Sequence, residues 1–122
     1  MSAPSLLRLS AVLVAAVVLS ACVQRMEAQE SVSPDGTLIL RIEVDKSVSP
    51  PVADVTRVFV MPSNSPTPAR QLIFKGSGVG NFVATWRNSE TLVLSYSRGS
   101  VSKCDPAPVL KTGQRLQVRG CT

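Results

Sequence analysis

The stretch Thr37-Leu-Ile-Leu-Arg-Ile-Glu-Val-Asp45 carries leucine, isoleucine or valine at every even position from 38 to 44. Charged side chains dominate its later odd positions. Because the side chains of a β-strand point alternately to its two faces, this period predicts a strand with one buried and one exposed face. The preceding Ser33-Pro-Asp-Gly36 has the residues of a tight turn, since proline fixes φ, aspartate caps the turn and glycine tolerates positive φ.

Outward from this strand, short apolar or alternating runs recur between loops rich in proline, glycine, serine and asparagine. The expected strands are 37–45, 55–61, 70–75, 81–87, 91–97, 109–111 and 115–119. The glycine-rich residues 76–80 are expected to form a flexible turn, and the residues after Gly99 a loop that contains Cys104. No amphipathic helix is expected. We therefore predict an all-β domain, built as a small antiparallel meander, sandwich or part-closed barrel of about seven short strands.

The composition argues against an enzyme. The chain has 122 residues and no histidine, which excludes Ser-His-Asp and Cys-His nucleophile pairs and every zinc site that contains histidine. Ser100–Lys103 and Lys111–Gly113 match strings of penicillin-recognising enzymes, but their proximity in a strand-rich tail indicates coincidence. Glu43 and Asp45 are interpreted as a solvated strand face rather than a metal site. We expect no catalytic residue, metal or cofactor.

Residues 1–21 have the three-part layout of a secretory signal. A short polar start with Arg8 precedes an apolar run at 11–19 and the small residues Ser20 and Ala21. Nine residues span only about 14 Å as a helix, roughly half of a hydrocarbon core, so the run is too short to cross a membrane. We expect this signal peptide to be removed.

Leu19-Ser-Ala-Cys22 follows the apolar run and resembles the lipobox of bacterial lipoproteins. The resemblance implies that the Cys22 thiol receives a diacylglycerol, that the signal is cleaved before Cys22, and that the new amino terminus is usually acylated. Such acyl chains hold a soluble domain on a bilayer, at about 0.8 kcal/mol per buried CH₂. Val23 at the next position implies sorting to the periplasmic face of the outer membrane. The alternative is an ordinary secretory signal cleaved after Cys22 or further on.

The three cysteines fit this resemblance. Lipidation of Cys22 removes the odd one, which leaves Cys104 and Cys121 to pair in an oxidising compartment. Their spacing is far from Cys-x-x-Cys, so we expect a structural disulfide. Residues 22–30 are polar and lack a period, and they are expected to form a tether between the lipid and a single domain at 31–122.

The segment from Trp86 to Tyr96 resembles a hairpin of small uncharacterised β-rich bacterial lipoproteins, which also carry an early Ser-Pro-Asp-Gly. Here the shared positions are Trp86, Asn88, Leu92, Leu94 and Tyr96. An aromatic side chain on each arm packs across a tight turn, which explains the pattern physically. This resemblance implies no known activity.

Charge is distributed unevenly along the chain after the signal. Residues 22–56 carry three basic and six acidic side chains, whereas residues 57–122 carry nine basic and two acidic ones. Arg115 and Arg119 share one face of the last expected strand. Arg87 lies on the polar face of the strand expected at 81–87. If these faces adjoin, the three arginines form a candidate anion-binding patch for lipid headgroups or other polyanions.

These features predict a lipid-anchored envelope protein that acts as a non-catalytic binding or structural module. Its expected partners are the membrane, through the lipid on Cys22, and anionic envelope components or an envelope protein. Nucleic acid is not expected, because an exported and anchored protein rarely meets it. The alternative is a small inhibitor of a cell-wall-degrading hydrolase, although the positive charge of the mature chain would repel a basic lysozyme.

Overall fold

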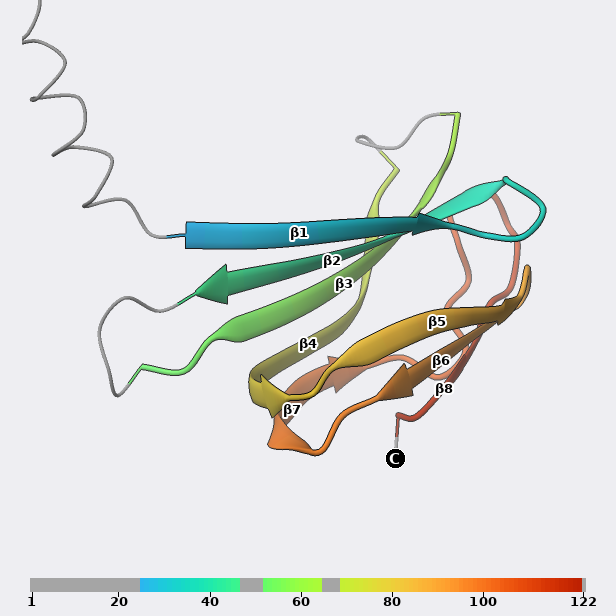
Figure 1. Ribbon diagram of the computed structural model, residues 1–122. Coiled ribbons are helices and arrows are strands. Elements are labelled where there is room, and N and C mark those ends of the chain that lie inside the picture. Colours follow the sequence, from blue (N-terminus) through green and yellow to red (C-terminus); the bar gives the residue numbers. More distant parts are fainter. Residues whose placement is uncertain (1–24, 47–51, 65–68, 122) are drawn as a thin grey trace, which may run out of the picture.

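Residues 25–46, 52–64 and 69–121 are described by a computed structural model of the protein, and they form eight β-strands (Figure 1). The strands are β1 (Arg25–Val32), β2 (Leu38–Lys46), β3 (Val55–Pro62), β4 (Gln71–Gly80), β5 (Val83–Asn88), β6 (Thr91–Ser95), β7 (Arg98–Cys104) and β8 (Gln117–Arg119). Within these ranges no helix is long and apolar enough to cross a membrane. The predicted all-β fold class is confirmed.

The strands form two sheets. The larger sheet has the order β1-β2-β3-β4-β7 and the smaller one the order β5-β6-β8. All neighbouring strands are antiparallel except β6 and β8, which are parallel. The chain passes from β4 directly into β5 and from β6 directly into β7, so one long bent hairpin crosses between the sheets (Figure 1). The two sheets do not close into a barrel, and the predicted sandwich or meander fits this arrangement.

The hydrophobic core joins both sheets. It contains buried side chains from the two sheets and from the segment between β7 and β8: Leu38, Leu40, Val58, Val60, Ile73, Phe74, Leu92, Leu94, Leu110, Leu116 and Val118. The predicted inward phases of β2 and β6 are therefore confirmed at Leu38, Leu40, Leu92 and Leu94.

The turn at Ser33–Gly36 forms as expected and also fastens the two sheets together. The Oδ1 atom of Asp35 accepts hydrogen bonds from Thr37 N (3.1 Å), Thr37 Oγ1 (2.7 Å) and Ser33 Oγ (2.8 Å). The backbone N–H of Asp35 donates to Ser89 Oγ (3.0 Å), in the turn between β5 and β6. The bonds from Thr37, followed by the bond from Ser33, lower the pKa of Asp35 from 3.8 to about 2.

Acid is expected to destabilise the unaltered protein more than an Asp35→Asn variant. The folded-state pKa of about 2 lies below the unfolded value of 3.8. The carboxylate therefore contributes stability that is fully present above pH 3.8 and is lost as the pH falls toward 2. Urea midpoints at about pH 6 and about pH 2.5 measure the loss, with Glu90→Gln on the neighbouring turn as a control that should behave like the unaltered protein. Equal acid losses in the unaltered protein and the Asp35→Asn variant would contradict this assignment.

The predicted tether is wrong over residues 25–30, because these residues belong to β1. This strand pairs along its whole length with β2, from Arg25 opposite Lys46 to Val32 opposite Ile39. The side chains of residues 26–32 are all exposed, so neither face has a hydrophobic period, and backbone pairing holds the strand. The expected start of the domain at residue 31 therefore moves to residue 25. The predicted signal peptide and Cys22 lie outside the described residues.

The described residues form eight strands, which agrees with the expected number of about seven, but the positions of some strands differ from the prediction. β7 lies where a loop was expected, and its side chains are exposed except for the half-buried Cys104. The residues 109–111, expected to be a strand, contribute an isolated bridge between Val109 and Arg115. β1 and β7 are the two edge strands of the larger sheet. Both were missed because an exposed edge strand carries no apolar period.

Residues 76–80 lie inside β4 instead of forming the expected flexible turn. A Cβ atom at Gly76 would come within 2.5 Å of Val79 Cγ2 and 3.2 Å of the Phe74 ring, so glycine is required where the strand packs against the core. Gly78 has a φ of 65°, and the pairing with β7 shifts register here. These glycines bend the strand toward the second sheet rather than ending it.

Candidate functional site

The predicted anion-binding arginines project from the outer face of the three-stranded sheet. In β8 Val118 is buried in the core, and the next residue, Arg119, is exposed. Arg119 pairs with Val93 of β6, which pairs with Thr85 of β5. Arg87 lies two residues beyond Thr85 on β5 and is also exposed. The register therefore places Thr85 and Arg119 on the same surface, on the two strands that flank β6. The exposed Arg87 lies beside this surface, where the pairing of β5 with β6 shifts register between Trp86 and Asn88.

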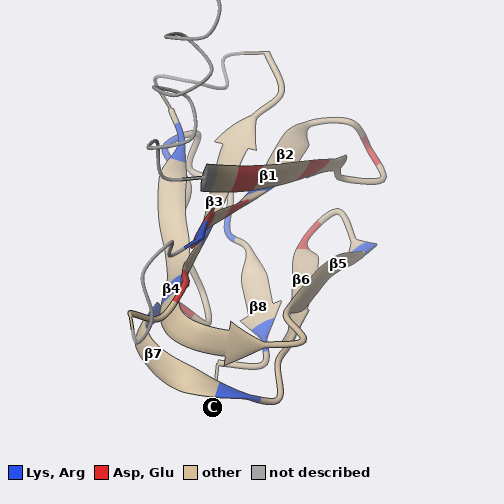
Figure 2. Cartoon of the chain, turned by 60° about the vertical axis from the view of Figure 1, so that its left-hand side comes forward, with Lys and Arg blue, Asp and Glu red and all other residues tan. Residues whose placement is uncertain are grey.

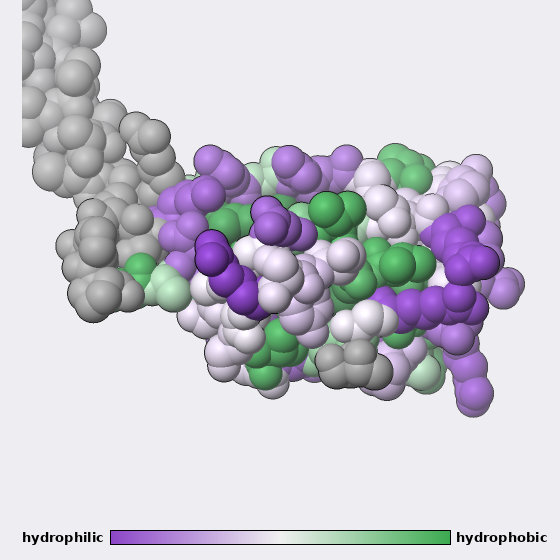
Figure 3. Space-filling model, turned by 60° about the horizontal axis from the view of Figure 1, so that its bottom comes forward, coloured by the Kyte–Doolittle hydropathy of each residue, from purple (hydrophilic) through white to green (hydrophobic). Residues whose placement is uncertain are grey.

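Arg115 belongs to the same surface. It is exposed and precedes β8. Because Leu116 and Val118 point into the core, Arg115 points to the same outer side as Arg119. A shallow depression of about 360 Å³ lies beside it, lined by Glu90, Thr91, Ala107, Arg115, Leu116 and Gln117. We call the surface that carries Arg87, Arg115 and Arg119 the basic face. Figure 3 shows the molecule from below, with hydrophilic and hydrophobic side chains mixed over this side.

The ion pairs of the described residues lie elsewhere in the fold. Their carboxylates are Glu27, Glu30, Glu43, Asp45 and Asp54, and their cations are Arg41, Lys46, Arg57 and Arg70. All of these residues lie on β1, β2 and β3 or just before β3 and β4. Figure 2 shows red segments on β1, blue segments on β7 and β8, and a red segment at the turn between β5 and β6. Among described residues, no carboxylate forms an ion pair with an arginine of the basic face.

Glu43 does not lie on a solvated face as the sequence predicted, whereas Asp45 stays partly exposed. The Glu43 carboxylate accepts hydrogen bonds from Arg41 Nε (2.6 Å) and Arg70 Nη1 (3.4 Å), and only 11% of its side chain is exposed. The bond to Glu43 raises the pKa of Arg41 above its usual value. Asp45 accepts a hydrogen bond from Arg57. The prediction of a solvated face is thus wrong for Glu43, because two guanidinium groups bind it.

These carboxylates do not form a binding site for a metal ion. In the described ranges, no group of three or more cysteine, aspartate and glutamate side chains is arranged to hold a metal ion. The carboxylates of β1 and β2 are instead matched by arginines and a lysine of β2 and β3. The arginines of the basic face, which form no ion pair with a described carboxylate, are therefore a stronger candidate for binding a ligand than these carboxylates.

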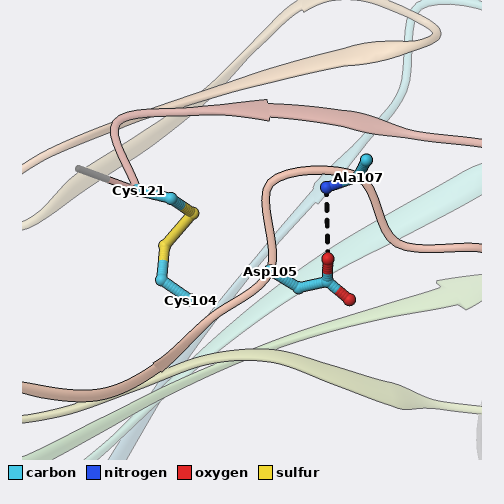
Figure 4. Close-up of a disulfide and its surroundings, with 4 residues drawn as sticks. All are labelled: Cys104, Asp105, Ala107 and Cys121. Carbon is cyan, nitrogen blue, oxygen red and sulfur yellow. Dashed lines mark hydrogen bonds between the residues drawn. A yellow bond between two sulfur atoms is a disulfide. The ribbon is translucent and has the colours of Figure 1, made fainter.

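The predicted disulfide between Cys104 and Cys121 is present, with an S–S distance of 1.98 Å and a Cα–Cα distance of 5.3 Å (Figure 4). It joins the end of β7, at one edge of the larger sheet, to the residue that closely follows β8 in the smaller sheet. Asp105 accepts a hydrogen bond from the backbone N–H of Ala107 (3.1 Å) and starts the turn that leaves β7. The bridge thus ties the strand that carries Arg119 to the rest of the fold.

Comparisons of the chain with protein-family models, with curated proteins and with solved structures found no match.

Proposed function

We propose that this protein is a lipid-anchored module of the bacterial cell envelope that binds an anionic envelope component through the basic face. The proposed binding function rests on one observation, that among the described residues the carboxylates of the larger sheet are paired and the arginines of the basic face are not. Carboxylates of the larger sheet are paired with cations of that sheet, whereas Arg87, Arg115 and Arg119 form no ion pair with a described carboxylate. Glu90 lines the depression beside Arg115, but the three arginines leave this surface with a net positive charge, and such a surface concentrates anionic ligands.

The proposed anchor rests on Leu19-Ser-Ala-Cys22, which resembles a lipobox. Because β1 begins at Arg25, only two residues separate this strand from Cys22. Three residue steps span at most about 11 Å, so a lipid on Cys22 would hold the domain against the bilayer. Trp86, next to Arg87, donates a hydrogen bond to the carbonyl of Ser31, near the far end of β1 (3.3 Å). β1 is roughly 23 Å long, so this end of the basic face is well separated from the anchor along the strand.

Binding without catalysis is the activity that these residues support. Arginines on a strand surface bind phosphate or carboxylate groups by charge and by several parallel N–H donors. We propose no reaction for this protein, and its ligand is an anionic polymer or lipid headgroup of the envelope.

The anchor is tested by the intact mass of the protein isolated from the membrane fraction. We expect the mass of residues 22–122 plus acyl groups, with an increase of about 2 Da on reduction of the disulfide. A mass without lipid would remove the anchor from the proposal and leave the binding function to be judged separately.

The basic face is tested by reversing the charge of two of its arginines. The purified full-length protein in neutral detergent is expected to bind a sulfated polysaccharide, and Arg115→Glu with Arg119→Glu should weaken this binding roughly tenfold or more, since each cation near an anionic surface contributes about 1 kcal/mol. Arg98→Glu with Lys111→Glu changes the net charge equally but alters no residue of the basic face. If both double variants bind equally weakly, net charge rather than the basic face governs binding.

A further inference from the structure

A second cluster of cations lies on the outer face of the larger sheet, and it was not predicted from the sequence. The register of the sheet places Glu43, Arg57, Lys75 and Lys103 in one row across β2, β3, β4 and β7. Lys75 and Lys103 are directly opposite one another on antiparallel strands. Residues in such pairs have Cβ atoms about 4.5–5.5 Å apart, and like charges at this position are destabilising.

Neighbouring carboxylates do not relieve this repulsion. β4 and β7 contain no aspartate or glutamate. Arg57, the next cation in the row, is hydrogen-bonded to Asp45 on the side away from Lys75. Among described residues, neither Lys75 nor Lys103 forms an ion pair. The two ammonium groups therefore face solvent together, half-buried at Lys75 and exposed at Lys103.

Two hydroxyl groups complete the cluster. Ser77 and Ser100 form the next outward-facing pair along the same two strands, and both are exposed. The intervening Gly76 points the other way, since a Cβ added to it would meet the buried ring of Phe74. Ser102 occupies the irregularity between the two pairs, where its hydroxyl donates to the carbonyl of Lys75 (3.2 Å) and fixes the local register.

We propose that Lys75, Lys103, Ser77 and Ser100 form a binding site for a phosphate dianion, either free or as the terminal monoester of a larger molecule. Two ammonium groups match its double charge, and two hydroxyls supply donors to its remaining oxygens. A carboxylate has one charge and two oxygens, and so would use only half of the site. The bound anion offsets the repulsion between the lysines. The site lies on the larger sheet, and it depends neither on the anchor nor on the basic face.

The test is thermal unfolding of the oxidised full-length protein at about pH 8, in chloride and in inorganic phosphate of equal ionic strength. At ten times its Kd, phosphate should raise the Tm by about 5 °C or more relative to chloride. The double variant Lys75→Gln with Lys103→Gln should lose this rise. In chloride, Lys103→Gln alone should unfold at a higher temperature than the unaltered protein, because the like-charge pair is gone.

Lys111→Gln is the matched control, since it removes one lysine from an exposed turn outside the site. This variant should keep the full response to phosphate, which separates site binding from the general stabilising effect of phosphate on proteins. Glycerol phosphate in place of inorganic phosphate distinguishes the source: an equal rise identifies a monoester ligand, and no rise identifies the free ion. The same phosphate response in the unaltered protein and the double variant would overturn the proposal, as would equal Tm values of the unaltered protein in phosphate and chloride.

Discussion

Replacing Phe74 with alanine is expected to lower the free energy of unfolding by about 3–5 kcal/mol. The Phe74 side chain is fully buried in β4, with its ring centroid 5.0 Å from that of Phe82 and 5.6 Å from that of Tyr96. Phe82 immediately precedes β5 and Tyr96 immediately follows β6. The three rings therefore pack where the bent hairpin passes between the sheets, and truncation of Phe74 leaves a cavity that joins both sheets.

Urea unfolding at neutral pH measures this loss through the midpoint and slope of the transition. Val83→Ala is the control, because Val83 lies nearby on β5 but is 53% exposed, and its truncation should change stability by no more than about 0.5 kcal/mol. A loss below about 1 kcal/mol for Phe74→Ala would mean that the aromatic cluster does not join the sheets energetically.

The buried strands could be predicted from the sequence, whereas the edge strands could not. β2 and β6 carry alternating apolar side chains because one face of each packs in the core, as Leu40 and Leu94 do. β1 and β7 lie at the edges of the larger sheet and expose nearly all of their side chains. Their position is determined by backbone pairing, which leaves no period in the side chains.

The glycine-rich residues 76–80 show a related limit. Glycine indicates a turn when only the local sequence is considered, because it adopts positive φ at little cost. Here Gly76 is needed within the strand, since the side chains of Phe74 and Val79, two and three residues away along the chain, occupy the space of a Cβ atom. Such a contact involves the folded packing of the bend, and the local pattern cannot distinguish it from a turn.

Of the two candidate anion sites, one could be predicted from the sequence and the other could not. The outward phase of Arg115 and Arg119 could be predicted from the alternation around the buried Leu116 and Val118, and the register then confirms that the strands carrying Arg87 and Arg119 flank β6. The pairing of Lys75 with Lys103 could not be predicted, because it requires β7 to be a strand and its register with β4 to be known. Two like charges that face each other across paired strands can be recognised only when the register is known.

Removal of the disulfide by Cys104→Ser with Cys121→Ser is expected to lower the free energy of unfolding by about 3 kcal/mol. The two cysteines are 17 positions apart, and in the chain-entropy model a bridge over a loop of this size stabilises mainly by restricting the unfolded chain. Because a small domain has a total stability of only about 5–15 kcal/mol, this loss is a large share of the whole.

Urea unfolding with and without reductant measures the effect. Reductant should lower the stability of the unaltered protein to that of the double serine variant and should leave the variant unchanged. A difference below about 1 kcal/mol between the oxidised protein and the variant would show that the burial of Leu110, Leu116 and Val118 alone holds the segment after β7.

Binding to the sulfated polysaccharide shows whether the disulfide acts on the unfolded chain or on the basic face of the folded protein. β8 has only three residues and pairs with β6 alone, but Val118 N also donates to the carbonyl of Pro106 (2.9 Å), and Val118 is buried in the core. If the bridge acts on the unfolded chain, Arg119 keeps its place, and the folded variant should bind the polysaccharide within about twofold of the unaltered protein. A tenfold loss of binding in the folded variant would instead mean that the bridge positions Arg119 and belongs to the basic face in function.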